Sequence, residues 1–418
     1  QGSAGGVDMS LAGLPQGWTQ HRSRRYKDSR FPDGYVYYFH AESQTSQWVL
    51  PGVAGAKRSR QEVAQEGSLS TLKRQTSATR GAGLRMKMAV EERDQLLAAS
   101  DGYLRVAGDR YQYFCDRAKK WAFETDAMGM ELLCELVKVN QQPLEICQAI
   151  IKQQGNAQQT MQEGTQIYSE KKHLIGDKGV TWSHDEYGHP GLQLMYLKMK
   201  SWQRFTETWA LLERAARQGL FKAHTTGPLR HRPVRVLSVG GGPGYELIAW
   251  RRFFQAFVDP DVPLDLVSLD LQPGWRPYVE AMGMHFKEWD INNGKLLETV
   301  SDVTSPGVTY VIISYVMIYC STPPVCDMLA QLLHSNEVRA ILVSERGLET
   351  KALGMMEARQ CQVLRLIDQI EGQDDRQSAW MGPSMRLTPT TQGPFQTIFP
   401  NQPFEDQKKK QRRRYSKH

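Results

Sequence analysis

The stretch Val234-Arg-Val-Leu-Ser-Val-Gly-Gly-Gly-Pro-Gly-Tyr-Glu246 sets the fold of the larger part of this chain. Its first half is short and rich in β-branched residues, which is typical of a buried strand. Gly240, Gly242 and Gly244 then permit a tight turn and let a ligand approach the backbone. Residues 245–257 read as a helix, whose N-terminus offers free N–H groups to a polar or anionic ligand group. Strand, glycine turn and helix together predict the opening unit of a doubly wound α/β domain.

Two further strand-like runs each end in an acidic residue. The run Leu264-Asp-Leu-Val-Ser-Leu-Asp270 alternates apolar and polar residues. An acid in the place of Asp270, at the carboxyl end of the second strand, can accept hydrogen bonds from ribose hydroxyls. The run His285-Phe-Lys-Glu-Trp-Asp290 reads as the third strand, and Ile291 follows it. The alternative to a ligand-binding turn is a tight turn that binds no ligand. The two acids at the strand ends make this alternative less well supported.

In this order, the glycine turn and the two acids resemble the class I S-adenosylmethionine (SAM) methyltransferase family, over about residues 170–400. The Gly-x-Gly-x-Gly spacing differs from the dinucleotide pattern G-x-G-x-x-G. The resemblance implies a doubly wound seven-stranded sheet over residues 171–402, with SAM as cofactor. It implies cofactor binding by Gly240, Gly242, Gly244, Asp270, Asp290 and Ile291, with the acid of the third strand facing the adenine amino group.

The fourth strand, predicted over residues 309–315, ends where this family places the methyl donor. Ser314 and Tyr315 stand there, where enzymes that methylate exocyclic base nitrogens carry an Asn/Asp-Pro-Pro-aromatic turn, so that chemistry is disfavoured. The fifth strand ends at Glu345, which is a candidate substrate ligand or base, or else a partner of Arg346 in a structural ion pair. The candidate catalytic residues are therefore Ser314, Tyr315 and Glu345. The closing antiparallel strands are predicted over residues 385–388 and 395–399.

Residues 11–53 resemble a WW domain, a small all-β module. The resemblance is carried by Leu14-Pro-Gln-Gly-Trp18, by the aromatic run before His40, and by Trp48 with Pro51. It implies that Tyr37 and Trp48 grip a polyproline II ligand. The middle run departs from the family, because it ends in His40-Ala41 where Asn-His is usual.

The first loop of this module is long and basic, and it includes Arg22 and Arg24. One interpretation is a solvated loop. The other is an arginine cluster that binds phosphoserine next to proline, because guanidinium groups pair with phosphate through charge-assisted hydrogen bonds. We therefore name Tyr37, Trp48, Arg22 and Arg24 as candidate peptide-binding residues.

The remaining segments differ in composition. Residues 54–88 and 403–418 are predicted to be a disordered basic linker and tail. The net charge of the chain is +7, and residues 407–418 alone hold seven Lys/Arg and no acid. Residues 89–170 read as a mixed hairpin and helical region, in which Pro143 is predicted to break the helix.

The six cysteines have no CxxC or zinc-like spacing, so no metal site is expected. No apolar run approaches the ~20 residues of a membrane-spanning helix, and no membrane partner is expected.

These patterns predict a SAM-dependent methyltransferase that acts on RNA, which the basic segments attract through phosphate. The WW-like module would recruit it to a proline-rich or phospho-Ser-Pro partner, such as the tail of RNA polymerase II, in the nucleus or otherwise the cytoplasm. Two alternatives stay open. One is a protein methyltransferase, and the other is a non-enzymatic adaptor with a degenerate methyltransferase fold.

Overall fold

The computed structural model describes residues 18–22, 36–40, 45–47, 103–107, 110–114, 122–169, 182–346, 349–367, 375–390 and 398–399. The chain divides into two units, Gln1–Arg74 and Gln75–His418. The division falls inside the predicted linker 54–88, which, like the predicted tail 403–418, lies outside the described residues.

The first unit contains one antiparallel sheet of three strands. They are β1 (Trp18–Arg22), β2 (Val36–His40) and β3 (Thr45–Gln47), in the order β1-β2-β3. Arg22 ends β1 and Tyr37 lies in β2, whereas Arg24 and Trp48 lie outside the described residues. The peptide groove therefore stays a prediction.

The second unit begins with another small antiparallel sheet and a pair of long helices. The elements are β4 (Tyr103–Ala107), β5 (Arg110–Phe114), β6 (Ala122–Thr125), α2 (Ala127–Gln153) and α3 (Ala157–Ser169). Asp126 caps α2, because its side chain accepts a hydrogen bond of 3.0 Å from the Gly129 N–H. The expected break at Pro143 is absent, and α2 runs through it. Apolar residues on both sides of this proline are buried, which offsets the ~3 kcal/mol that an interior proline costs a helix.

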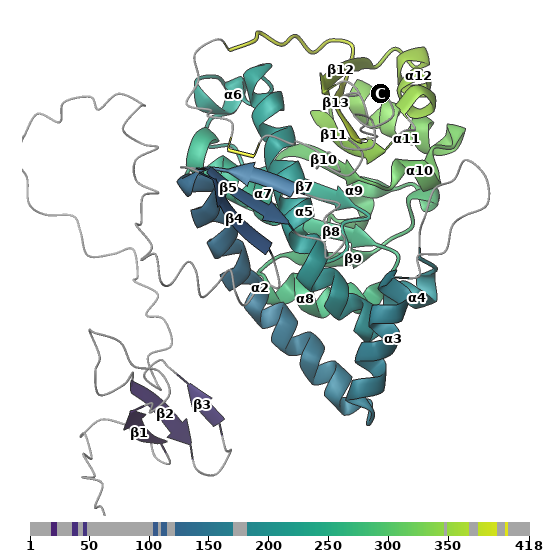
Figure 1. Ribbon diagram of the computed structural model, residues 1–418. Helices are drawn as coiled ribbons and strands as arrows, with labels where there is room; N and C mark the ends of the chain where they lie inside the picture. The colour runs from purple at the N-terminus through teal and green to yellow at the C-terminus, as the bar shows by residue number, and fades with distance from the viewer. Residues whose placement is uncertain are drawn as a thin grey trace, which may run out of the picture. The chain divides into compact units, whose positions relative to one another are not determined.

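A seven-stranded sheet forms the centre of the second unit (Figure 1). Its strands are β7 (Val234–Val239), β8 (Leu264–Asp270), β9 (His285–Glu288), β10 (Val308–Ser314), β11 (Ala340–Arg346), β12 (Gln362–Ile367) and β13 (Asp375–Met381). The order is β12-β13-β11-β10-β7-β8-β9, and β13 is antiparallel to both of its neighbours. The predicted α/β class with a doubly wound seven-stranded sheet is confirmed. The closing strands, however, are β12 and β13. The strand expected at 385–388 is wrong, and most of the one expected at 395–399 lies outside the described residues.

Alternate residues of the central strands face two separate hydrophobic cores. Tyr310 and Ile312 of β10 belong to one core, and Val311 and Ile313 belong to the other. The first core is covered by α2, α5 (Pro190–Arg217), α7 (Tyr245–Phe253) and α8 (Arg276–Ala281). The second is covered by α9 (Leu296–Thr299), α10 (Met317–Cys320), α11 (Pro323–His334) and α12 (Glu349–Ala358). Helices on both faces are what a doubly wound sheet requires.

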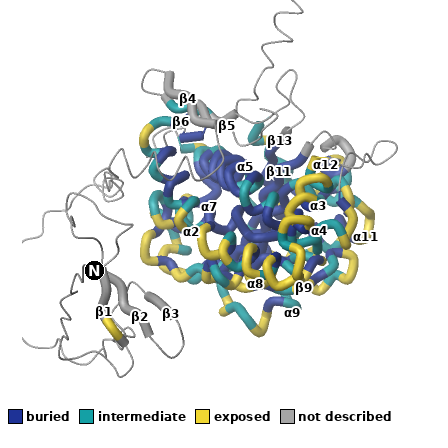
Figure 2. Tube along the Cα trace, turned by 60° about the horizontal axis from the view of Figure 1, so that its bottom comes forward, coloured by how far each residue is buried: buried dark blue, intermediate teal, exposed yellow. Residues whose placement is uncertain are grey.

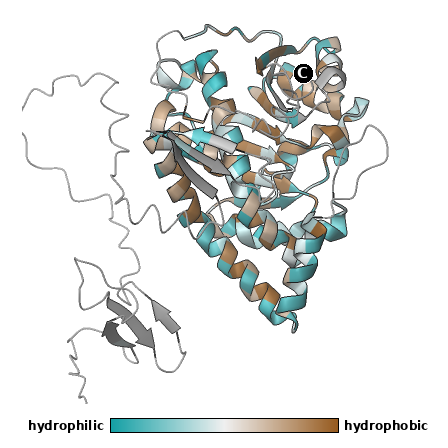
Figure 3. Ribbon diagram, in the orientation of Figure 1, coloured by the Kyte–Doolittle hydropathy of each residue, from teal (hydrophilic) through white to brown (hydrophobic). Residues whose placement is uncertain are grey.

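Helix α5 is buried along most of its length (Figure 2). Its neighbours α2 and α3 alternate hydrophilic and hydrophobic patches along their length (Figure 3), as expected of helices with one exposed side. Shorter elements complete the unit, namely α4 (His184–Gly188), α6 (Lys222–Thr225), η2 (Phe254–Val258), η3 (Pro273–Trp275) and η4 (Ile291–Asn293). None of the helices in the described part of the chain is both long and apolar enough to cross a membrane.

Candidate cofactor and active site

The turn between β7 and α7 requires glycine at three positions. Gly240, Gly242 and Gly244 have φ angles of 62°, 49° and 88°, in the left-handed region that side chains rarely adopt. A Cβ added to Gly240 would lie 2.3 Å from Val316 Cγ2, and one added to Gly244 would lie 2.9 Å from Met284 Cε. A Cβ added to Gly242 would lie 3.8 Å from its nearest contact, Trp275 Cε2, which is an ordinary van der Waals distance. The turn is therefore closely packed at its two ends and less so at its middle residue.

Asp270 joins this turn to the end of β8. Its Oδ2 accepts a hydrogen bond from the Gly242 N–H at 2.9 Å, and its Oδ1 accepts one from the Gln272 N–H at 2.9 Å. Burial raises the pKa of Asp270, and these two backbone bonds act against the rise. A carboxylate has about four acceptor positions, so Asp270 keeps the capacity to accept hydroxyl hydrogen bonds. Leu271, which the sequence analysis did not single out, follows it with 53% of its surface exposed.

Asp290 and Ile291 lie at the next strand end. The Asp290 Oδ1 accepts hydrogen bonds of 2.9 Å from both the backbone N–H and the side-chain amide of Asn292, which fixes the start of η4. Ile291 is 9% exposed. Because β8 and β9 are parallel neighbours, Asp270 and Asp290 lie at the same edge of the sheet, as predicted from their order in the sequence.

Ser314 ends β10 and Tyr315 follows it, beside the glycine turn. The Ser314 side chain is buried, and its Oγ has no hydrogen-bond partner among the described residues. Tyr315 has a φ of 59°, an uncommon conformation for an aromatic residue and one found at functional sites. Its backbone N–H donates to Ser344 at 2.8 Å, and its hydroxyl donates to Glu207 Oε1 at 2.9 Å.

Glu345 has a structural contact that the sequence did not predict. Its Oε2 accepts a hydrogen bond of 3.2 Å from the Ile318 N–H, in the first turn of α10. Glu345 thereby ties the end of β11 to the segment that follows β10. The roles predicted for it, as a base or as a substrate ligand, stay predictions.

A buried polar cluster on α5 was missed by the sequence analysis. The Arg204 guanidinium lies 4.1 Å from the centre of the Tyr315 ring. Its Nε lies 3.7 Å from Glu246 Oε1, and its Nη1 lies 4.0 Å from Glu207 Oε2. Glu207 also accepts a hydrogen bond of 2.9 Å from Gln203. The available signal was a group of polar residues within a long helix, and polar residues of a helix usually face solvent.

Aromatic residues of α4 and α5 line the loop after β8. The ring centres of Tyr196 and Trp275 are 5.2 Å apart, and Tyr196 also contacts Trp182 and Tyr187. The Gln272 side chain donates a hydrogen bond of 3.0 Å to the His184 carbonyl. These contacts hold α4 against the loop that carries Asp270. In the described ranges, no group of three or more His, Cys, Asp or Glu side chains is placed to hold a metal.

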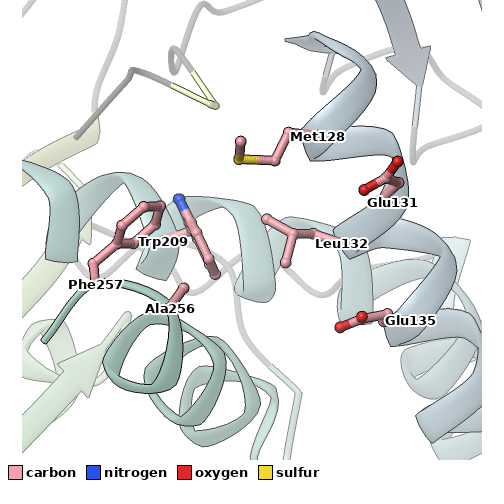
Figure 4. A pocket seen from close by; sticks show the side chains of 7 residues that line it. All are labelled: Met128, Glu131, Leu132, Glu135, Trp209, Ala256 and Phe257. Carbon is pink, nitrogen blue, oxygen red and sulfur yellow. The ribbon is translucent and has the colours of Figure 1, made fainter. Parts of the chain in front are cut away.

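A separate apolar pocket lies between α2, α5 and η2 (Figure 4). It is lined by Met128, Glu131, Leu132, Glu135, Trp209, Ala256 and Phe257. Glu135 is paired with Arg252 at 3.2 Å. None of the predicted site residues lines this pocket, so it is not the site that the sequence predicts.

Comparison with known proteins found no matching family model and no matching curated protein. Solved structures with a similar fold were found. The DszA carbon methyltransferase is 12% identical, with a TM-score of 0.26, and the match covers 37% of this chain and 49% of that one. A SAM-dependent methyltransferase from Aquifex aeolicus is 12% identical, with a TM-score of 0.25 and coverages of 35% and 81%.

A third similar structure is the plantazolicin methyltransferase BamL, in complex with a triazolic desmethylPZN analogue and SAH. It is 12% identical to this chain, with a TM-score of 0.30, and the match covers 44% of this chain and 89% of that one. This chain spans about half the length of the DszA enzyme.

Proposed function

We propose that the second unit is a SAM-dependent methyltransferase. The observation that carries this proposal is the link between Gly242 and Asp270 at the carboxyl edge of the sheet. A Cβ at Gly242 would meet no atom closer than 3.8 Å, and Asp270 retains acceptor capacity next to the turn. Ligands of doubly wound domains bind at this edge, where the strand order reverses.

The residues at this edge fit the adenosine part of SAM. Asp270 would accept hydrogen bonds from the ribose hydroxyls, and Asp290 would accept one from the adenine amino group. Leu271 and Ile291 offer apolar surface for the two faces of the base, and Leu271 is exposed for that contact. When bound, SAM supplies an electrophilic methyl group on a sulfonium.

On the acceptor side, Ser314 and Tyr315 are the candidates. The Ser314 Oγ has no hydrogen-bond partner among the residues described, so it is available to orient an acceptor atom. The Tyr315 ring is held between Arg204 and Glu207, which fixes the backbone at the end of β10. A nucleophilic acceptor held in line needs no strong base, because orientation alone supplies a large part of the rate. Glu345 remains the alternative base.

We further propose RNA as the acceptor, with recruitment through the first unit to a proline-rich or phospho-Ser-Pro peptide in the nucleus. The support is compositional. The basic residues of 407–418 would attract phosphate backbones without sequence preference. A protein acceptor is the alternative, and transfer from labelled SAM to total RNA and total protein separates the two.

The binding test uses calorimetry with S-adenosylhomocysteine (SAH). Wild-type protein should bind SAH, and Asp270→Asn should weaken binding by about 1–3 kcal/mol, because a buried hydrogen bond is lost. The matched control is Asp261→Asn, because Asp261 is an exposed acid that precedes β8, whereas Asp270 ends β8. If wild-type protein gives no heat of binding and no thermal shift with millimolar SAH, the proposed methyltransferase function is contradicted. The non-enzymatic adaptor is then the remaining alternative.

A further inference from the structure

The charged side chains around Arg204 are distinct from the residues proposed to bind adenosine and the acceptor, although they contact Tyr315. It brings one guanidinium together with the carboxylates of Glu207 and Glu246 and the ring of Tyr315. Tyr196 also belongs to it. Burial raises the pKa of the Tyr196 hydroxyl, and the charge of Arg204 acts against that rise. Four of these five side chains are contributed by α5 and α7.

The cluster lies between the glycine turn and the end of β10. Glu246 is in the first turn of α7, two residues after Gly244. Tyr315 is followed by Val316, the residue that closely approaches Gly240. The cluster is therefore next to the place where the cofactor's sulfur must lie if Asp270 holds its ribose.

The Arg204 side chain is incompletely partnered although only 14% of it is exposed. Its Nη1 is buried and has no hydrogen-bond partner in the part of the chain that the structure describes. The nearest carboxylate oxygens, at 3.7 Å and 4.0 Å, are beyond hydrogen-bond range. A buried donor without a partner costs free energy, so a ligand that accepts from it would be favoured.

The charges of the cluster also match one end of the cofactor. Arg204 supplies one positive charge, and Glu207 and Glu246 supply two negative charges when ionised. The amino-acid end of SAM carries one carboxylate and one ammonium group, and the adjoining sulfonium carries a second positive charge. The two sets are complementary in number and sign, which is the arrangement that favours binding of a charged ligand in a partly buried site.

We propose that this cluster is the binding site for the amino-acid end of the cofactor, in which Arg204 binds the carboxylate and Glu246 binds the ammonium. The inference rests on the proposed function, because it assumes that SAM is the ligand. It assigns to α5 a direct part in cofactor recognition. It also places the carboxylate contact against the ring of Tyr315, at the end of the strand that faces the acceptor.

The test compares three ligands by calorimetry on the full chain. They are SAH, SAH without its carboxylate, and 5′-methylthioadenosine, which lacks the whole amino-acid end. Wild-type protein should prefer SAH over the decarboxylated form by about tenfold or more, since hydrogen bonds to charged groups are the strong ones. In Arg204→Met, the affinity for SAH should fall by a similar factor. The affinities for the decarboxylated form and for methylthioadenosine should change by less than about twofold.

Matched variants distinguish a binding role from a structural one. Arg252→Met removes an arginine of α7 that pairs with Glu135 away from the cluster, and it should keep the wild-type preference. Arg204→Lys keeps the charge but loses the planar fork, and it should retain part of the preference. Glu246→Gln should weaken SAH more than an SAH analogue without the amino group.

Two results would overturn the inference while leaving the cofactor in place. One is equal weakening of all three ligands in Arg204→Met, which would indicate a structural arginine. The other is wild-type protein that binds methylthioadenosine and has equal affinity for SAH and its decarboxylated form. This result needs no variant, so it applies even if Arg204→Met fails to fold. Wild-type protein that binds none of the three ligands would instead contradict the proposed function.

Discussion

Gly240 and Gly283 have similar left-handed backbones but different surroundings. Their φ angles are 62° and 69°. A Cβ at Gly240 would lie 2.3 Å from Val316, whereas nothing lies within 4 Å of a Cβ at Gly283. In Gly283→Ala the free energy of unfolding should therefore fall by only ~1–2 kcal/mol, which is the cost of a left-handed alanine. In Gly240→Ala the free energy of unfolding should fall by ~1–3 kcal/mol more, because the added methyl group also overpacks the turn.

Urea unfolding of the two glycine variants measures this difference. Equal losses would mean that Val316 moves aside freely, and the turn would then be less tightly packed than its geometry indicates.

Glu213 should make stability depend on pH. It is 2% exposed, and its Oε1 accepts hydrogen bonds from the Trp209 indole at 2.9 Å and the Ile398 N–H at 3.0 Å. Burial raises its pKa to about 7 from an ordinary value of 4.5. Between these two values the folded state holds more protons than the unfolded state. The free energy of unfolding should therefore fall as pH rises through this window, by on the order of 2–3 kcal/mol.

Glu213→Gln keeps an oxygen that can accept both hydrogen bonds but has no charge to bury. Its free energy of unfolding should lack this fall, and above pH 7 it should exceed that of wild type. Urea unfolding at pH 5 and pH 8 provides the comparison. The same pH slope in both proteins would show that Glu213 ionises freely in the fold.

Single residues of the site were predictable where backbone geometry or strand position demands a residue type. Gly240, Gly242 and Gly244 occupy left-handed positions, and Asp270 ends a strand next to them. Arg204 was not predictable, because nothing local distinguishes a buried arginine from an exposed one within a helix. Its surroundings arise from the packing of α5 on α7 and β10, which are distant in the sequence.

At the scale of elements, helices α3 and α5 cross where Gly164 meets Gly191. A Cβ added to Gly164 would lie 2.0 Å from the Gly191 carbonyl carbon. Gly164→Ala should therefore push α3 away from α5 and loosen the segment that leads into α4, where Trp182 stacks on Tyr168 of α3. We expect faster hydrogen exchange across residues 157–169 and 182–188.

The control for this crossing is Gly354→Ala in α12, an exposed helical glycine with nothing within 4 Å of an added Cβ. It should be neutral or stabilising by up to ~1 kcal/mol, because alanine favours a helix. Unchanged exchange in Gly164→Ala would show that the crossing tolerates a wider spacing.

The closing strands show where element prediction failed. Strand β13 includes Gln377 and Ser378, which are buried. Polar residues next to acidic ones are more typical of a loop than of a buried strand. In the fold, the Gln377 amide donates a hydrogen bond of 2.9 Å to the Glu207 carbonyl, and its oxygen accepts one from Arg214. These partners come from α5, so tertiary contacts rather than local preference made this segment a buried strand.

At the scale of the whole molecule, the division into two units leads us to expect that the proposed peptide binding and the proposed cofactor binding are separable. Fluorescence anisotropy should show tighter binding of phosphorylated Ser-Pro peptides than of plain ones, because Arg22 and Arg24 can pair with phosphate. Trp48→Ala should abolish peptide binding without changing the affinity for SAH. Equal affinity for both peptides would contradict the predicted contact with phosphate. Peptide binding that is unaffected by Trp48→Ala would contradict the predicted groove.

The insertion of β13 between β11 and β12 has a consequence for the growing chain on the ribosome. Among the described strands, β12 pairs with β13 alone, yet it is synthesised first. Until residues 375–381 emerge, β12 has no partner in the sheet, and one edge of β11 stays open. An open edge can pair with a strand of another chain. A chain from which residues 375–381 have not yet emerged would therefore keep one sheet edge open to pairing with another chain.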